Sequence, residues 1–190
     1  MATIVRHTHD MDVALPPETL AELRTGVLVR IRPIRPDDIQ RLRDFHDRLS
    51  SNTTRLRFFS PLRHLSSVFA DHLASVDFKK RCAFVISPLE DDTIHAVGRY
   101  EGETLRCAEV AFVVEDTMQG LGIGKLLLDR LVDHARTAGF TRFSAVTLCE
   151  NNQMLNLFRE SAYHAHIHVE RDLAFVRMDI RPAQQLEAAG

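Results

Sequence analysis

A short glycine-rich segment is the part of this sequence whose residue spacing most clearly suggests chemistry. Residues 119–125 read QGLGIGK, between an apolar stretch and a strongly amphipathic one. This order predicts a strand, a loop and the first turn of a helix. A glycine loop at a helix start presents unpaired backbone N–H groups and the positive end of the helix dipole, and glycine allows close approach of a ligand. The segment therefore predicts a phosphate-binding loop.

Two familiar nucleotide-binding patterns do not fit this loop. The dinucleotide pattern GxGxxG needs a third glycine where Lys125 stands. The Walker pattern GxxxxGK[ST] fails because Leu126 follows Lys125 and because Gln119 replaces the first glycine. From the loop alone, a glycine-rich helix start without a ligand remains an alternative.

A second candidate for chemistry is Glu109, ten residues before Gln119. It begins an otherwise apolar expected strand and shares one face of that strand with Ala111 and Val113, because side chains alternate with a period of two. A carboxylate in such surroundings is costly unless it is paired or used. Two interpretations stay open: a functional carboxylate, or an ion-pair partner of Arg99 or Arg106.

Histidine and arginine clusters are weaker candidates. His164, His166 and His168 would share one face of a strand, where three imidazoles could bind Zn²⁺ or Ni²⁺. No Cys or acidic ligand stands nearby at metal-binding spacing, so we expect solvated or interface histidines and no metal. A second cluster could form a basic rim for a phosphate or an acidic partner, although a solvated helix face is the simpler interpretation. Its members are Arg55, Arg57 and Arg63.

Hydrophobic periodicity predicts the elements that must position these residues. The expected strands are 27–31, 82–87, 95–101, 108–114, 143–148, 163–169 and 172–180. One expected helix begins at Pro36. Four further helices are expected over 51–58, 65–76, 122–138 and 151–161, and Asn151 caps the last of them. Strand 108–114 is nearly all apolar, which predicts burial on both faces. The order of elements favours an α/β (α+β) fold with a mixed sheet.

Length and composition limit the class of protein. A chain of 190 residues with 45% hydrophobic and 26% charged residues predicts one globular domain. A net charge of −2 lacks the basic footprint of most nucleic-acid binders, and we expect no nucleic-acid or membrane partner. The three cysteines form no CxxC pair and no secretory signal is visible, so we expect a cytoplasmic protein, either monomer or dimer. They are Cys82, Cys107 and Cys149.

The glycine loop and the last helix together resemble a known family. Gln119, Gly122 and Gly124 match the pattern Gln-x-x-Gly-x-Gly of the GNAT superfamily, the acyl-CoA-dependent N-acetyltransferases. The family's late helix usually reads Asn-x-x-Ala-x-x-Leu-Tyr-x-x-x-Gly-Phe. This chain has, at the same spacing, Asn151, Met154, Leu157, Phe158, Ala162 and Tyr163. The stretches 32–38 and 56–60 also resemble the acetyltransferase domain of bacterial Pat-type protein lysine acetyltransferases.

The resemblance implies a fold and a cofactor. The expected fold is a mixed, mostly antiparallel central sheet flanked by helices, with splayed central strands that form the acyl-CoA cleft. Residues 27–182 would form this domain, and residues 183–190 would form a C-terminal tail. Residues 1–26 would form an N-terminal appendage that cofactor binding does not need. We expect a short helix near 16–24 within that appendage. Acetyl-CoA would be the cosubstrate. The implied cofactor-binding residues are Phe112, Val113, Val114, Gln119, Gly120, Leu121, Gly122, Ile123, Gly124, Lys125, Asn151 and Phe158.

The resemblance also implies an activity. The chain would transfer an acetyl group from acetyl-CoA to a primary amine by direct attack, with a protein lysine as the preferred acceptor. A lysine amine is mostly protonated near pH 7, so a base must accept its proton. The Pat-like enzymes carry a glutamate at the position of Glu109, which makes Glu109 the implied catalytic base. A small amine or amino acid as acceptor, and a catalytically silent acyl-CoA-binding module, remain alternatives.

One departure from the family concerns the general acid. The family commonly has a tyrosine where this chain has Phe158. Its role toward the leaving CoA thiolate is therefore vacant or filled elsewhere. Tyr163 and Cys149 are the nearest replacements in the sequence.

Overall fold

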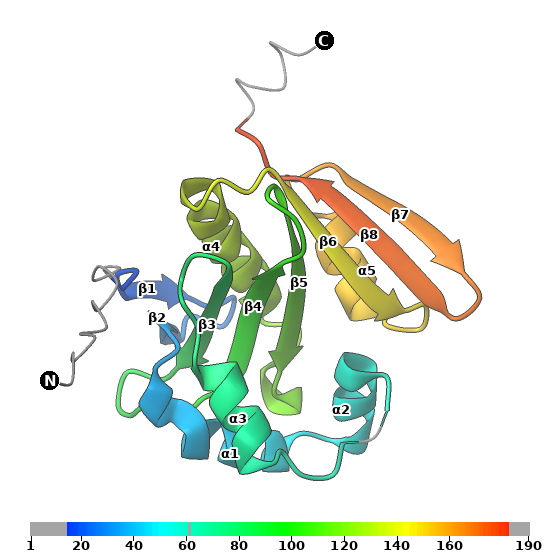
Figure 1. Ribbon diagram of the computed structural model, residues 1–190. Helices are drawn as coiled ribbons and strands as arrows, with labels where there is room; N and C mark the ends of the chain where they lie inside the picture. The colour runs from blue at the N-terminus through cyan, green and yellow to red at the C-terminus, as the bar shows by residue number, and fades with distance from the viewer. Residues whose placement is uncertain (1–14, 61, 183–190) are drawn as a thin grey trace, which may run out of the picture.

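The computed structural model describes residues 15–60 and 62–182 and contains one eight-stranded sheet (Figure 1). Its strands follow the order β1-β2-β3-β4-β5-β6-β8-β7. The strands are β1 Thr19–Glu22, β2 Leu28–Pro33, β3 Arg81–Ser87, β4 Ala96–Gly102, β5 Cys107–Val114, β6 Arg142–Leu148, β7 Ala165–Glu170 and β8 Leu173–Asp179. The α-helices are α1 Ile39–Arg48, α2 Ser51–Phe58, α3 Ser67–Ala74, α4 Ile123–Thr137 and α5 Asn152–Arg159. Short 3₁₀ turns at Pro36–Asp38 and Asp116–Met118 precede α1 and the glycine loop.

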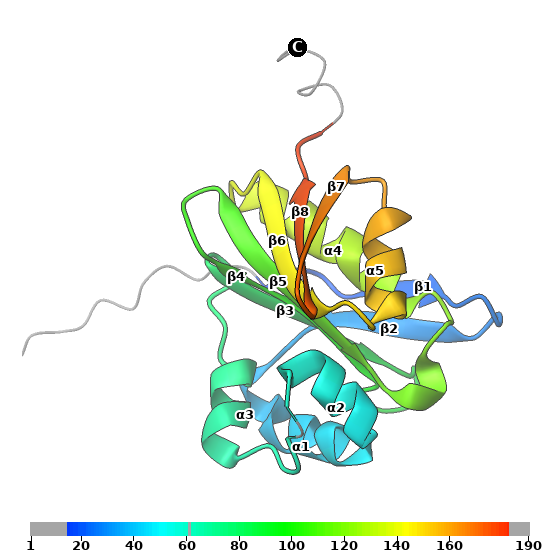
Figure 2. The same cartoon turned by 90° about the vertical axis from the view of Figure 1, so that its right-hand side faces the viewer.

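Helices cover both faces of the sheet. Figure 2 shows α1, α2 and α3 on one side, with α4 and α5 on the other. Each side has its own apolar core. Leu42 and Phe45 of α1 pack toward Val85 and Val97, whereas the apolar face of α4 packs against the opposite face of the sheet. The expected mixed, mostly antiparallel fold is therefore confirmed.

The centre of the sheet is split. The strands β5 and β6 run parallel and pair at only three positions, Cys107 with Arg142, Ala108 with Phe143, and Glu109 with Ser144. Beyond Glu109 the two strands diverge, which Figure 1 shows as a wedge between β5 and β6. The edge of β5 from 110 to 114 is thus left without a strand partner on this side, and its backbone groups are available to a ligand.

The N-terminal segment is a correction to the sequence analysis. Residues 16–24 do not form the expected helix, since Thr19–Glu22 is strand β1 and pairs antiparallel with β2. A tight turn joins the two strands, with Gly26 at φ +83° and Leu23 N–H donating to the carbonyl of Val27 at 2.9 Å. Leu23 is buried in the core next to α4. Pairing with the free edge of β2 overrides local helix propensity here.

A second correction concerns β5, which is not buried on both faces. Val110 and Phe112 are buried against the α4 side, whereas Glu109 is exposed and Ala111 and Val113 are half-buried on the other side. The expectation failed because an all-apolar strand can also line a cavity. Val113 borders both the core under α1 and the cleft described below.

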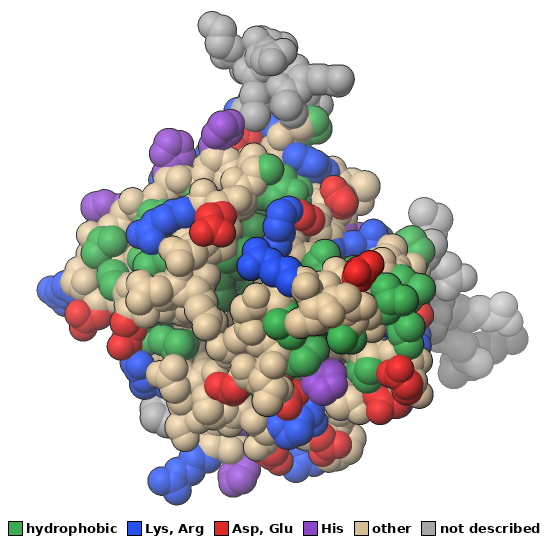
Figure 3. Space-filling model, turned by 180° about the vertical axis from the view of Figure 1, so that it is seen from behind, with side chains coloured by type: hydrophobic (Ala, Val, Ile, Leu, Met, Phe, Trp, Pro, Cys, Tyr) green, Lys and Arg blue, Asp and Glu red, His purple; other side chains and the backbone are tan. Residues whose placement is uncertain are grey.

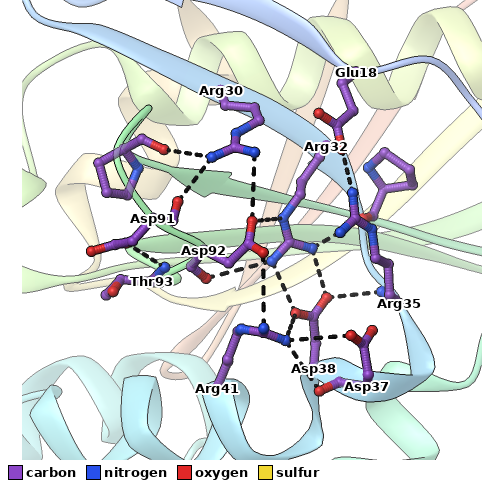
Figure 4. Close-up of polar contacts among 12 residues, drawn as sticks. Glu18, Arg30, Arg32, Arg35, Asp37, Asp38, Arg41, Asp91, Asp92 and Thr93 are labelled. Atoms are coloured by element: carbon purple, nitrogen blue, oxygen red, sulfur yellow. Dashed lines mark hydrogen bonds and ion pairs between the residues drawn. The ribbon is translucent and has the colours of Figure 1, made fainter.

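A buried ion pair fixes the start of α1 to the sheet (Figure 4). Arg32 of β2 and Asp38 are both fully buried, and Arg32 donates two hydrogen bonds to the Asp38 carboxylate at 2.7 and 2.9 Å. The backbone N–H of Arg35 and the guanidinium of Arg41 also donate to Asp38. Asp92, in the turn between β3 and β4, lies 3.5 Å from Arg32 Nε. This network joins β2 and the start of α1 to a turn that is far away in the sequence.

The surface of the described part of the chain mixes both charge signs. On the face seen in Figure 3, basic and acidic side chains are interspersed around hydrophobic patches. Within residues 15–60 and 62–182, no helix has the length and apolar character that a membrane crossing requires. In the same ranges, no three His, Cys, Asp or Glu side chains are grouped as metal ligands would be.

Candidate active site

A cleft of about 830 Å³ occupies the wedge between β5 and β6. The diverging strands form its floor, the glycine loop and the start of α4 form one end, and α2 and α5 form its walls. Residues from all these elements line it. The shape follows from the three-residue pairing of β5 with β6, because a fully paired sheet would leave no space there.

The glycine loop presents a row of free backbone donors at this cleft. Within the described residues, the N–H groups from Gly120 to Gly124 donate no hydrogen bond, and the first donors of the helix are Lys125 and Leu126, both to the carbonyl of Gly122. Gly120 and Gly122 have φ of +77° and +92°, a region that side chains with a Cβ rarely adopt. Consecutive free amides at a helix start fit the phosphates of CoA.

Gln119 holds this loop in place through its side chain. Its Nε2 donates to the carbonyl of Val114 at 3.0 Å and to Thr53 Oγ1 at 3.2 Å. Thr53 Oγ1 in turn donates to Asp116, whose carboxylate also accepts from Ser50 at the start of α2. The side chain of Gln119 therefore ties the loop to β5 and α2.

Most of the predicted cofactor-binding residues line the cleft. Phe112, Val113 and Val114 do so from β5, and Phe158 does so from α5. The loop residues Gln119 to Lys125 also line it, with the exception of Leu121. The Leu121 side chain packs on the core and its carbonyl accepts from the Arg24 N–H at 3.4 Å, so only its backbone N–H remains for a cofactor.

Asn151 and Lys125 are placed differently within the cleft. Asn151 caps α5, because its Oδ1 accepts from the Met154 N–H at 3.1 Å. This leaves its Nδ2 as a donor toward the cleft, in line with the predicted contact to pantetheine. Lys125 forms an exposed ion pair with Asp129 at 2.5 Å, so its ammonium is already partnered.

Glu109 lies where β5 and β6 separate. It is the last residue of β5 that pairs with β6, and it lines the cleft with an exposed side chain. Among the described residues its carboxylate makes no hydrogen bond and no ion pair. The alternative of an ion pair with Arg99 or Arg106 is therefore not what the structure contains.

Two arginines lie near Glu109 on the same side of the sheet. Arg99 of β4 is paired in register with Ala111, two residues along β5 from Glu109. Arg57 of α2 lines the cleft, and burial lowers its pKa while the charge of Glu109 opposes that shift. Burial, with the charge of Arg57, lowers the pKa of Arg99 to about 10. The carboxylate therefore lies in a locally cationic environment.

The two proposed replacements for the missing tyrosine lie away from this cleft. Tyr163 donates to Asp129 at 3.1 Å, and burial together with that carboxylate raises its pKa to about 12. Cys149 is half-buried and its Sγ lies 3.8 Å from the carbonyl of Arg171. Neither residue lines the cleft. Phe158 itself is buried and packs near Phe112, with ring centroids 6.4 Å apart.

Arg24 and Thr147 are among the cleft residues that the sequence did not predict. Arg24 follows β1, and its Nε would lie 3.7 Å from a Cβ placed at Gly122. Thr147 of β6 lines the cleft with a buried hydroxyl that has no partner among the described residues. Only the pairing of β1 with β2 brings Arg24 to the loop, so no local signal could have found it. Thr147 carried no signal beyond its place in an expected strand.

Comparison with known proteins agrees with this fold and cleft. Residues 47–163 match the Acetyltransferase (GNAT) family. The chain is 36% identical over 139 residues to Acetyltransferase PA5475 of Pseudomonas aeruginosa, which covers 71% of this chain and 74% of that protein. It is 30% identical over 161 residues to Acetyltransferase Pat of Mycolicibacterium smegmatis, and this alignment covers 84% of this chain and 47% of that protein. This chain therefore spans about half the length of the mycobacterial relative.

A solved structure gives the same result. The GNAT domain of S. lividans PAT superposes with a TM-score of 0.79 at 30% identity, over 85% of this chain and 96% of that one. This chain belongs to the GNAT family of acetyltransferases. It is an acyl-CoA-dependent N-acetyltransferase that uses acetyl-CoA as cosubstrate, and the free amides of the glycine loop fit that molecule.

Proposed function

We propose that this protein transfers the acetyl group of acetyl-CoA to a primary amine by direct attack, with Glu109 as general base and a protein lysine as the preferred acceptor. The observation that carries the proposal is the position of Glu109. It is a carboxylate without a protein partner among the described residues, at the point where β5 and β6 separate. The similarity to two proteins named Pat supports lysine as the acceptor.

The other cleft residues bind and orient acetyl-CoA in this proposal. Acetyl-CoA supplies an activated thioester when it is bound. The free N–H groups of 120–124 hold its phosphates, Asn151 Nδ2 donates to the pantetheine arm, and the unpaired edge of β5 aligns that arm. Glu109 would accept the proton that the acceptor's ammonium must lose. The neutral amine then attacks the thioester carbonyl, and the C–S bond breaks to release the CoA thiolate.

The reaction does not need an acid at position 158. A thiol ionises near pH 8.5 in water, so a CoA thiolate is a tolerable leaving group near neutral pH. The amine, by contrast, is almost fully protonated there. Proton acceptance by Glu109 is therefore the larger requirement, and Phe158 is free to serve as a packing residue.

A second candidate function is acetylation of a small amine or a free amino acid. The observation that favours it is the pair of arginines beside Glu109, since cationic walls suit an acceptor that carries its own negative charge. A silent acyl-CoA-binding module is disfavoured by the position of Glu109, whose exposed carboxylate has no protein partner among the described residues and lies where β5 and β6 separate.

The test combines one product analysis with two matched variants. A lysate incubated with acetyl-CoA and the wild-type protein is compared by mass spectrometry with the same lysate incubated with Glu109→Gln. The control is Glu101→Gln, because Glu101 is paired in register with Glu109 but is exposed on β4 and forms an ion pair with Arg81. We expect new acetyl-lysines with wild type and with the control, and few with Glu109→Gln.

Other outcomes separate the alternatives. Acetylated small amines without acetyl-lysine would reject the protein acceptor and keep the chemistry. Equal product from Glu109→Gln and wild type would reject Glu109 as the base. Acetyl-CoA binding without any acetylated product would identify a silent binding module.

A further inference from the structure

A small recess opens beside the cleft on the side of α1 and α3. It has a volume of about 40 Å³ and shares Arg57, Ala111 and Val113 with the lining of the cleft. A buried water needs about 10–15 Å³ by a comparable measure, so the recess holds a group of roughly three non-hydrogen atoms. Its volume suits a group as small as a carboxylate.

Two arginines, Arg57 and Arg99, line this recess and leave most of their hydrogen-bond donors free. Arg99 is 8% exposed, and among the described residues it makes one hydrogen bond, at 3.3 Å to the carbonyl of Leu73. Arg57 makes no hydrogen bond or ion pair there, and its guanidinium lies 5.0 Å from the ring of Phe58. A guanidinium has five N–H donors, so most donors of both residues remain available. Arg57 is half-buried and feels the charge of Glu109, and no nitrogen of Arg57 or Arg99 is both fully buried and without a partner in the described part of the chain. Their free donors are therefore accessible to a partner that arrives from outside the chain.

A third side chain lines the same recess. His46 of α1 is 4% exposed, and neither of its ring nitrogens has a hydrogen-bond partner among the described residues. The nearest carboxylate oxygen, Oδ1 of Asp47, is 3.8 Å from Nδ1. A buried imidazole always carries at least one N–H, so His46 adds another unused donor.

A purely structural explanation covers only part of these contacts. Arg99 lies at the C-terminal end of α3, where a cation is favourable, and its bond to Leu73 fits that role. The contact of Arg57 with Phe58 leaves its N–H groups unused. Neither role explains why an unpartnered histidine faces the same space.

We propose that Arg57, Arg99 and His46 bind a carboxylate carried by one of the two substrates, and that this recess sets the specificity of the transferase. The inference rests on the proposed function, because it assigns a substrate group to a recess that shares part of its lining with the cleft. The carboxylate has two possible sources, the acceptor amine or the acyl group of a dicarboxylic acyl-CoA. Both present the same planar anion to the two guanidinium groups.

The first arm of the test concerns the acyl group. Calorimetry on the full chain compares succinyl-CoA with butyryl-CoA, which have four-carbon acyl groups with and without a terminal carboxylate. The second arm concerns the acceptor. Release of CoA from acetyl-CoA is measured with a panel of free amino acids and with the corresponding amino-acid amides. We expect a preference of about tenfold or more for the carboxylate in one arm, as suits charge-assisted hydrogen bonds.

The variants assign that preference to the recess. In Arg57→Gln and in Arg99→Gln the ratio of carboxylate to neutral ligand should fall to near one, whereas a loss of folding would lower both members of the pair together. Arg57→Lys should restore part of the ratio, because it keeps the charge and loses the planar fork. Arg63→Gln removes the same charge from an exposed position after α2 and should leave the ratio unchanged.

Each result has a consequence. A preference in the first arm identifies the acyl group as the source, and a preference in the second identifies the acceptor. No preference in either arm, or a preference that survives both Arg57→Gln and Arg99→Gln, overturns the proposal. Failure of the wild-type protein to bind acetyl-CoA would instead reject the proposed function itself.

Discussion

Two arginine-rich regions lie on the same face of the sheet, and they differ in whether their arginines are paired with carboxylates. Around Arg32, a fully buried guanidinium meets the Asp38 carboxylate with two hydrogen bonds, and Asp92 lies nearby (Figure 4). Around Glu109, Arg57 and Arg99 are buried to different degrees and have no ion pair with any described residue. Arg32 and Asp38 are closed to solvent, whereas Glu109 and Arg57 line the cleft.

This difference separates charges that hold the fold from charges that meet a substrate. Burial alone would raise the pKa of Asp38, but hydrogen bonds from Arg32 and from the Arg35 N–H hold it below its usual range. The charge of Asp38 is thus compensated within the protein. The arginines near Glu109 have no carboxylate bound to them among the described residues, and Arg57 is half-buried at the cleft, where a complementary ligand can reach it. The same residue type therefore supports stability in one region and recognition in the other.

The largest expected effect comes from removing an arginine in each region. Arg32→Gln leaves the Asp38 carboxylate buried without its main partner, and we expect a loss of about 3–5 kcal/mol in the free energy of unfolding. Arg57→Gln removes a charge that has no hydrogen bond or ion pair within residues 15–60 and 62–182, so the change should stay within about 1 kcal/mol. Urea unfolding followed by circular dichroism measures both. Similar losses in the two variants would contradict the comparison.

The next effect concerns the glycine loop. Gly122→Val places a branched side chain at φ +92°, where the free amides converge, and should weaken acetyl-CoA binding about ten- to a hundredfold through loss of charge-assisted hydrogen bonds. Gly139→Val is the matched control, because Gly139 has φ +90° at the end of α4 and does not line the cleft. Calorimetry on both variants decides the matter, since equal affinities would show that the phosphates bind elsewhere.

The acid stability of the protein depends on the buried pair of Arg32 and Asp38. The pKa of Asp38 is lower in the folded state than in the unfolded chain, where a carboxyl titrates near 3.9. Its contribution is therefore complete above that value and is lost as the pH falls through the folded-state pKa. Unfolding measured from about pH 6 to about pH 2 should show a shallower decline in Asp38→Asn than in wild type. Parallel curves would mean that other carboxylates govern the acid transition.

The smallest effect concerns the cations around the loop. Arg24 is exposed beside Gly122 and has no ion pair in the described residues, whereas Lys125 is already bound to Asp129. We expect Arg24→Gln to weaken acetyl-CoA binding about two- to fivefold at low salt, and Lys125→Gln to change it less. The difference should shrink as salt is added. A larger effect from Lys125→Gln would show that its pair with Asp129 opens to bind phosphate.

The sequence predicted those parts of the site that depend on local pattern. The glycine loop, the start of α4 and the cap at Asn151 follow from residues close together in the chain, and the structure places them as expected. Strand β1 was missed because its pairing with β2 is a tertiary contact, and Arg24 was missed with it. Arg57 was predicted only as part of a basic rim. Nothing in the local sequence indicates that Arg57, and not Arg55, lines the cleft. Arg55 instead forms an ion pair with Glu150.

If Glu109 accepts the proton of the amine and has no structural role, the Glu109→Gln variant should change the pH dependence of the reaction. Rates are measured at saturating acetyl-CoA with one amine acceptor. We expect kcat to fall about 10²–10⁴-fold near neutral pH, with acetyl-CoA affinity close to wild type. Activity should recover toward high pH, because a lysine amine loses its own proton near pH 10.4. A variant that keeps the full rate and the wild-type pH profile would show that Glu109 is not the base.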